Sequence, residues 1–204
     1  VMVVCSWMGH GWCDGLYYYR PVESGAPKFI ESEVVVYGGT PAGVAAAIES
    51  ARMGKKTVLL SFNRHVGGVT SGGLTASDLG KADSIGGVAL EFYKRLGRNI
   101  DFSPSEAESM YLEMLFEAGV EVLFERHLDS VSMTSGQLSS ITMDSGESFG
   151  AKVFVDATYE GDLFAAAGVS YQVGREPAGA YGETLGGQWQ KISWKNVYQF
   201  CRLP

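Results

Sequence analysis

The chain has 204 residues, a formal net charge of −7 and a hydrophobic fraction of 46%, as is ordinary for a globular protein. The negative charge disfavours nucleic acid and anionic membrane surfaces as partners, because both repel an acidic protein. The three cysteines, Cys5, Cys13 and Cys201, form no C-x-x-C pair, so no metal or iron–sulfur site is expected. No apolar run has the length of a membrane-spanning helix.

Residues 1–32 show no regular period and are expected to form an irregular lead-in. Residues 1–8 are apolar and resemble the end of a signal-peptide core, but the charged segment that normally precedes such a core is missing. The first residue is Val1 rather than Met, which leads us to expect a fragment or a processed form. Localisation therefore stays open between the cytoplasm and export.

The chain is organised around a strand, a glycine turn and a helix within residues 33–53. Val34, Val35 and Val36 form a β-branched run typical of a parallel strand buried on both faces. In a turn of the dinucleotide-binding type, glycines let the backbone approach a pyrophosphate, and the following helix offers it free N–H groups. The turn here consists of Gly38, Gly39, Thr40, Pro41, Ala42 and Gly43. Thr40 replaces the second glycine of G-x-G-x-x-G, and its hydroxyl is a candidate donor to the phosphate.

A second strand is expected at residues 57–60 and completes a βαβ unit of the size that a dinucleotide site needs. The residue that follows this second strand is usually an acid that binds the adenosine ribose. Here it is Ser61, which retains a single hydrogen bond but loses the charge-assisted pair.

A second glycine-rich loop follows at residues 63–74, with four glycines and interleaved Thr and Ser. Such a loop of N–H and hydroxyl donors can wrap a phosphate or a flavin edge, although a plain surface loop is the alternative. The loop follows the second strand at the carboxyl edge of the sheet, where ligands of such sheets bind, and this position favours a ligand-binding loop over a plain surface loop.

The remaining pattern predicts an α/β fold, namely a Rossmann-like parallel sheet with an inserted antiparallel β-meander. Helical periodicity covers residues 84–97, and Ser103-Pro104-Ser105-Glu106 is a capping box that starts another helix. A third strand is expected at residues 120–124, and a return to the parallel sheet at residues 152–155. The meander between them is expected at residues 130–134, 138–143 and 148–151.

Three motifs occur together in the order found in the bacterial FAD-dependent oxidoreductases: residues 34–43, 64–73 and 156–162. The chain resembles that family over residues 33–188, and Gly174-Arg175-Glu176-Pro177 also fits it. The family is related to the flavin domain of heterodisulfide reductase and belongs to the glutathione-reductase-like flavoproteins.

The resemblance implies FAD as cofactor and hydride transfer through the flavin to or from an unknown substrate. It implies an FAD-binding domain at residues 33–185. Since such proteins are usually longer, residues 186–204 would begin an incomplete region, and a missing C-terminal region of the same protein is expected. Matched residue by residue, the cofactor-binding positions would be Gly38, Gly39, Thr40, Pro41, Ala42, Gly43, Ser61, Arg64, Gly67, Gly68, Thr70, Ser71, Gly72, Asp156, Ala157 and Thr158.

No catalytic residue can be assigned from the sequence. His65 is a titratable candidate near the loop, but bracing of the loop is the favoured interpretation. Glu160 and Asp162 are interpreted as capping a helix rather than as catalytic acids. Two alternatives stay open: a dehydrogenase that uses NAD as its only cofactor, which Ser61 and the second loop disfavour, and a nucleotide-binding module without catalysis.

Overall fold

The computed structural model describes residues 27–73, 81–98, 101–171, 173–174 and 176–182. One compact unit ends at Gly168 and a second begins at Val169. The described part of the second unit contains the one-turn helix α6 (Ala178–Tyr181). The expectations for residues 1–8 and for residues 186–204 lie outside the described residues.

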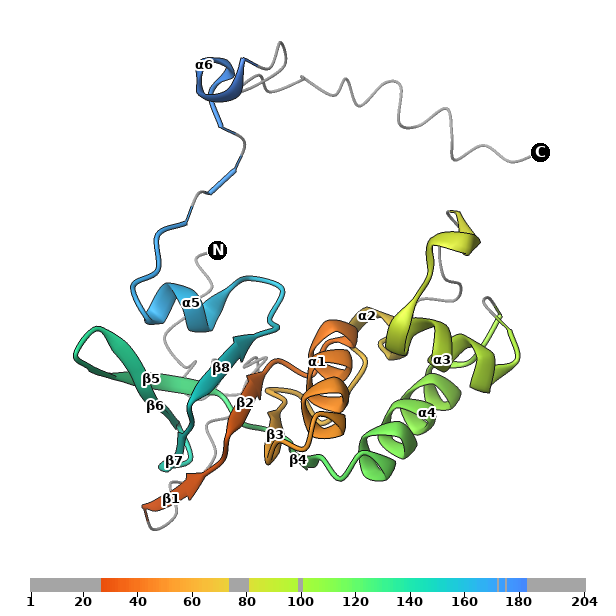
Figure 1. The fold of residues 1–204 in the computed structure, drawn as a ribbon, viewed down its shortest axis with the longest axis horizontal. Coiled ribbons are helices and arrows are strands. Elements are labelled where there is room, and N and C mark those ends of the chain that lie inside the picture. Colours follow the sequence, from red (N-terminus) through yellow and green to blue (C-terminus); the bar gives the residue numbers. More distant parts are fainter. Residues whose placement is uncertain (1–26, 74–80, 99–100, 172, 175, 183–204) are drawn as a thin grey trace, which may run out of the picture. The chain divides into compact units, whose positions relative to one another are not determined.

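The first unit is built on a parallel sheet with the strand order β4-β3-β2-β8 (Figure 1). Each strand is short and pairs in parallel with its neighbours, as the βαβ pattern predicted. The strands are β2 (Val34–Tyr37), β3 (Thr57–Leu60), β4 (Glu121–Leu123) and β8 (Val153–Asp156). The order places β2 between β3 and β8, so its carboxyl end lies between the ends of these two strands.

A second sheet has the strand order β1-β7-β6-β5 and contains the predicted meander. Its antiparallel strands are β5 (Leu128–Thr134), β6 (Gln137–Met143) and β7 (Glu147–Gly150). The expectation of an irregular lead-in up to residue 32 was wrong at its end, because β1 (Lys28–Glu31) pairs in parallel with β7. The sequence did not indicate this strand, since its partner lies more than a hundred residues away.

Three helices cover one face of the parallel sheet: α1 (Pro41–Arg52), α3 (Gly87–Leu96) and α4 (Pro104–Glu117). Their buried side chains form one core with Val34 and Val36. The apolar stripe of α4 packs into this core, where Ala107, Tyr111 and Met114 are buried. The predicted capping box is also confirmed: the Ser103 hydroxyl accepts from the Glu106 amide, and the Glu106 carboxylate accepts from the Ser103 amide.

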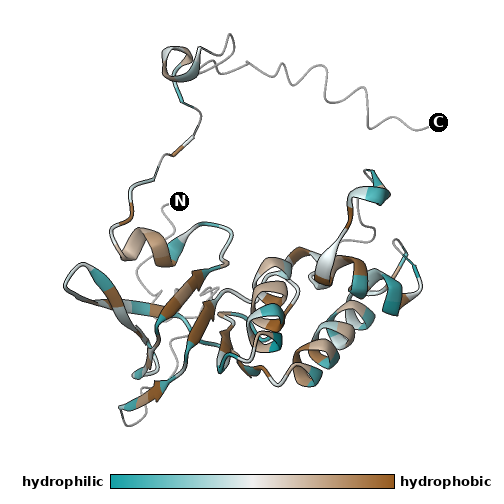
Figure 2. Cartoon of the chain, in the orientation of Figure 1, coloured by the Kyte–Doolittle hydropathy of each residue, from teal (hydrophilic) through white to brown (hydrophobic). Residues whose placement is uncertain are grey.

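The meander sheet covers the other face of the parallel sheet. Val35 and Tyr37 point to this side and pack with Ile141, Met143 and Phe149. Strand β2 is therefore buried on both faces, as its run of valines predicted, and β2 and β8 are largely brown in the hydropathy colouring of Figure 2.

Short helical turns complete the first unit. The predicted glycine loop contains one such turn, α2 (Gly68–Ser71), which the sequence pattern did not predict. The 3₁₀ turn η1 (Ala82–Ser84) precedes α3, and α5 (Asp162–Ala166) follows β8. None of the helices among the described residues is long and apolar enough to cross a membrane.

Candidate functional site

The first glycine turn is packed so tightly that side chains are excluded at its centre. Gly38 has a φ of +116°, and a Cβ there would lie 2.6 Å from the carbonyl carbon of Ala157. A Cβ at Gly39 would lie 2.5 Å from the Oγ atom of Ser61. The turn is therefore held between the ends of β3 and β8, which leaves its outer side bare backbone.

Bare backbone N–H groups gather where this turn meets α1. Within the described residues, the amides of Gly39, Thr40 and Ala42 have no hydrogen-bond partner. They precede or open a twelve-residue helix with no acidic residue in its first turn. The amides and the positive end of the helix dipole together suit a phosphate group.

The Thr40 hydroxyl, a candidate phosphate donor in the sequence, is bonded inside the protein. The residue is only 3% exposed, and its hydroxyl donates to the carbonyl of Ala157 over 2.7 Å while it accepts from the amide of Gly43 over 3.2 Å. Because a hydroxyl has one proton, Thr40 has none left to donate to a phosphate. The expectation of a side-chain phosphate contact is corrected: Thr40 is the N-cap of α1 and ties it to the end of β8.

The second glycine loop is fastened directly to the first. The amide of Gly67 donates to the carbonyl of Gly39 over 2.7 Å. The Ser71 hydroxyl donates to the carbonyl of Val66, and Thr70 lies beside the phenol of Tyr111. Gly68 stands near Pro41, since a Cβ there would approach the proline Cδ to 3.2 Å. The structure thus brings the two predicted loops together at the N-terminus of α1.

Arg64 and His65 turn away from this junction and bind carboxylates on other elements. The Nε atom of Arg64 lies 2.7 Å from a carboxylate oxygen of Glu125, and the Arg64 side chain is 78% exposed. The Nδ1 atom of His65 lies 3.0 Å from the carboxylate of Glu108, which also accepts from the amide of Val66. This geometry agrees with the interpretation of His65 as a brace.

The geometry does not support the predicted ribose contact of Ser61. The residue is 1% exposed, and its hydroxyl donates to the carbonyl of His65 and accepts from the amide of Asn63. Its own amide and carbonyl are bonded to Leu123 and Arg126. Every polar atom of Ser61 is therefore already used inside the protein.

The motif at residues 156–158 forms a closed hydrogen-bonded turn at the end of β8. The Asp156 carboxylate accepts from the amide and hydroxyl of Thr158 and from the amide of Phe164. The Thr158 hydroxyl in turn accepts from the amides of Gly161 and Asp162. Asp156 and Thr158 thus satisfy the start of α5, a role that the sequence pattern had assigned to Glu160 and Asp162. Only the backbone of this turn faces Gly38.

A cavity of about 420 Å³ opens at the carboxyl edge of the parallel sheet, on the meander side. The sequence interpretation missed its walls, which include Tyr37, Phe62, His127, Asp129 and Asp162. Tyr37 is the last residue of β2, and Phe62 follows Ser61 just after β3, so their place at the carboxyl ends of strands was the available signal. Burial raises the pKa of Tyr37 and lowers that of His127, so both are uncharged at neutral pH.

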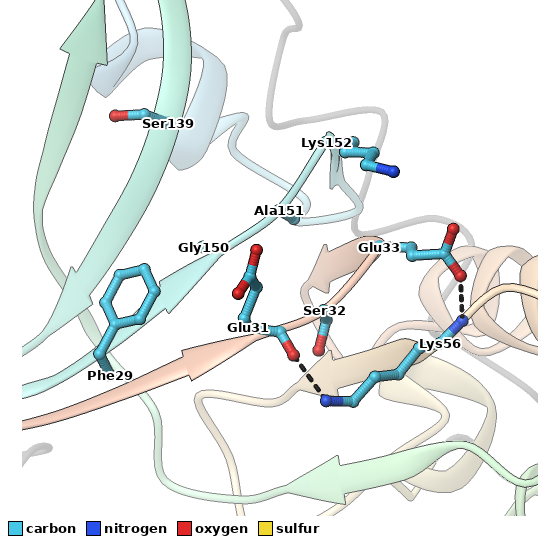
Figure 3. Close-up of a pocket in the computed structure, with 9 residues that line it drawn as sticks. All are labelled: Phe29, Glu31, Ser32, Glu33, Lys56, Ser139, Gly150, Ala151 and Lys152. Carbon is cyan, nitrogen blue, oxygen red and sulfur yellow. Dashed lines mark hydrogen bonds between the residues drawn. The ribbon is translucent and has the colours of Figure 1, made fainter.

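Another cavity, of about 450 Å³, lies at the opposite edge of the sheet (Figure 3). Its walls include Phe29, Ser32, Glu33, Lys56, Gly150 and Lys152. Lys56 donates from its ammonium to the carbonyl of Glu31 over 2.7 Å and from its amide to the Glu33 carboxylate over 3.1 Å. This cavity lies at the amino ends of β2 and β8, whereas ligands of such sheets bind at the carboxyl ends.

The described residues contain no group of three or more His, Cys, Asp or Glu side chains that could hold a metal ion. The chemical groups at the carboxyl edge are instead backbone amides, aromatic rings and two exposed carboxylates. Such groups can bind a phosphate at the N-terminus of α1 and an aromatic ring in the cavity.

A protein-family model described as "FAD dependent oxidoreductase" matches residues 33–201. The match begins one residue before β2 and includes both glycine loops and the turn after β8.

Solved structures share the fold at low sequence identity. L-proline dehydrogenase from P. horikoshii is 16% identical with a TM-score of 0.57, and the match covers 74% of this chain and 59% of that one. A Diels–Alderase from pyrroindomycin biosynthesis is 18% identical with a TM-score of 0.52, covering 71% and 36%. A geranylgeranyl bacteriochlorophyll reductase-like protein from Thermoplasma acidophilum is 14% identical with a TM-score of 0.50, covering 71% and 44%. The chain thus matches about three fifths or less of each of these proteins.

Proposed function

Since this chain belongs to the FAD-dependent oxidoreductase family, we propose that it is the FAD-binding part of an enzyme that transfers hydride between the flavin and a substrate. FAD supplies the redox chemistry when bound, and the protein supplies position, electrostatics and shielding. The observation that carries the proposal is the set of amides of Gly39, Thr40 and Ala42, unpaired among the described residues, beside two glycine loops that are bonded to each other.

The geometry supports a specific division of the cofactor site. The pyrophosphate would bind the amides at the N-terminus of α1, where Pro41 and Gly43 complete the turn. Gly67, Gly68, Thr70, Ser71 and Gly72 would face the flavin side of the pyrophosphate. The adenosine would occupy the cavity lined by Phe62, His127 and Leu128, with the 3% exposed Tyr37 also in its wall.

Three of the sequence-predicted positions would act indirectly. Ala157 offers its carbonyl to Thr40, and Asp156 and Thr158 hold the turn that packs on Gly38. Their proposed role is to fix the shape of the pyrophosphate turn. Ser61 is not proposed as a ligand, because its polar atoms are already bonded.

We further propose that the chain stands near the glutathione-reductase-like flavoproteins and the flavin domain of heterodisulfide reductase. The support is the order of the three motifs and the meander between β4 and β8. The substrate domain of such proteins would be supplied by sequence beyond this chain.

The test is the visible absorption spectrum of the purified chain, followed by identification of any released pigment. We expect oxidised-flavin bands, and FAD rather than FMN after denaturation. A colourless protein that takes up NAD but not added FAD would favour the NAD-only dehydrogenase. Bound FAD that dithionite reduces but no substrate reduces, even in a longer form of the protein, would favour the binding module without catalysis.

A further inference from the structure

Tyr159 joins the turn after β8 to the second glycine loop, although no sequence argument assigned it a role. It follows the Asp156–Thr158 turn, and the residue is 59% exposed. Its hydroxyl oxygen accepts from the amide of Val69 over 2.9 Å. A Cβ at Gly68 would collide with this hydroxyl and would lie 3.2 Å from the Cδ atom of Pro41. The hydroxyl therefore lies close to Gly68 and near the N-terminus of α1.

The hydrogen bonds at this hydroxyl leave its proton uncommitted. A phenol has one donor and accepts through its oxygen. The oxygen accepts from Val69, and among the described residues the Tyr159 hydroxyl makes no donated hydrogen bond. The Val69 amide holds the oxygen in place, and the proton stays available to a ligand beside the second glycine loop.

We infer that Tyr159 is a cofactor-binding residue that donates its hydroxyl proton to a phosphate oxygen of the nucleotide. This inference rests on the proposed function and deepens it. It adds a side-chain donor to a site otherwise made of backbone amides, since the hydroxyls of Thr40 and Ser71 are donated to carbonyl groups. It also explains why Gly68 bears no side chain, because a Cβ there would displace the phenol.

The experiment compares Tyr159→Phe with the wild-type chain, both stripped of flavin. The substitution keeps the ring and removes only the hydroxyl. Dissociation constants are measured for FAD, for ADP, which carries the pyrophosphate, and for adenosine, which carries no phosphate. A hydrogen bond to a charged phosphate predicts about tenfold weaker binding of FAD and ADP, with adenosine unchanged. Tyr93→Phe is the matched control, because Tyr93 lies on α3 among the core aromatics.

Each other result overturns the inference in a recognisable way. If FAD, ADP and adenosine all bind the variant more weakly by the same factor, and its melting temperature is lower, Tyr159 only stabilises the fold. Tighter binding of ADP by the variant would mean that the phenol competes with phosphate for the Val69 amide. Wild-type affinity for FAD in the variant overturns this inference alone, whereas a wild-type chain that binds no FAD overturns the proposed function as well.

Discussion

Thr40 shows how one side chain connects two distant parts of the site. Its hydroxyl caps α1 and donates to the carbonyl of Ala157, which lies 117 residues further along the chain. Thr40→Val has nearly the same shape but leaves the Ala157 carbonyl and the Gly43 amide without a partner. We expect the free energy of unfolding to fall by about 2 kcal/mol, measured by urea denaturation, with weaker FAD binding. Thr40→Ser retains the hydroxyl and should stay within about 0.5 kcal/mol of wild type; a loss equal to that of Thr40→Val would refute the hydrogen-bond explanation.

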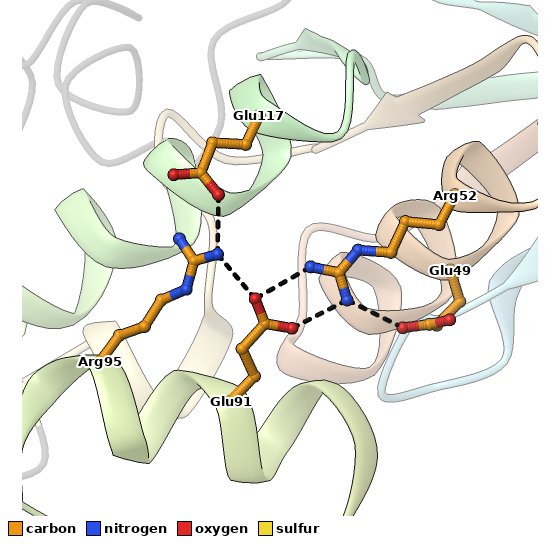
Figure 4. Close-up of polar contacts among 5 residues, drawn as sticks. All are labelled: Glu49, Arg52, Glu91, Arg95 and Glu117. Carbon is orange, nitrogen blue, oxygen red and sulfur yellow. Dashed lines mark hydrogen bonds and ion pairs between the residues drawn. The ribbon is translucent and has the colours of Figure 1, made fainter.

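Between elements, ion pairs join the helices that support the site. Glu91 on α3 accepts from Arg52 on α1 over 2.9 Å and from Arg95 over 2.7 Å, and Arg95 also reaches Glu117 on α4 (Figure 4). The hydrogen bond from Arg52, with that from Arg95, lowers the pKa of Glu91 below its usual value of 4.5. The ionised Glu91 carboxylate therefore stabilises the folded protein above pH 4.5, and this stabilisation is lost as the pH falls through the lowered pKa.

Glu91→Gln tests this network. We expect the variant to lose about 0.5–1 kcal/mol of unfolding free energy at pH 7, because the pairs are partly exposed. The difference from wild type should shrink in 1 M salt and as the pH falls through the lowered pKa of Glu91, because the protonated carboxyl no longer pairs with the arginines. Glu113→Gln is the control, since Glu113 on α4 makes no ion pair with any described residue. A difference that persists unchanged at low pH would mean that packing, rather than charge, is responsible.

For the molecule as a whole, alkaline stability should report on the contact between the helical layer and the second glycine loop. Tyr111 on α4 stacks on Phe92 with ring centres 4.2 Å apart and packs against Gly67. Burial raises the pKa of Tyr111 to about 12. The unfolded chain releases this proton near pH 10 and the folded protein only near pH 12, so stability falls as the pH rises between these values.

The measurement is the free energy of unfolding between pH 9 and pH 12. We expect the wild type to lose about 2 kcal/mol through Tyr111, and Tyr111→Phe to remove that part of the slope while it keeps the stack on Phe92. Part of the slope should remain, because burial also raises the pKa of Tyr37. Tyr93→Phe is the control and should retain most of the slope, because burial raises the pKa of Tyr111 more than the nearby Tyr93 does. An identical slope in Tyr111→Phe would exclude this tyrosine as the source.

Features that depend on neighbouring residues could be predicted from the sequence. A run of valines followed by Gly38 and Gly39 specifies a buried strand and a tight turn, because burial and positive φ act locally. The capping box at Ser103 and the stripe of α4 follow from spacing alone. The parallel sheet, the meander and the family resemblance followed from the same kind of local pattern.

Which polar atoms remain available to a ligand, by contrast, depends on the tertiary fold. Thr40 and Ser61 looked like ligands in the sequence, but their hydroxyls are used by carbonyls of other loops. Tyr159 showed no signal in sequence, yet its hydroxyl meets an amide 90 residues away. Strand β1 likewise depends on a partner that a local pattern cannot reveal. The physical reason is that a donor or acceptor bonds to the polar group that the fold brings close to it. The distance between two such groups in space cannot be read from their separation in the sequence.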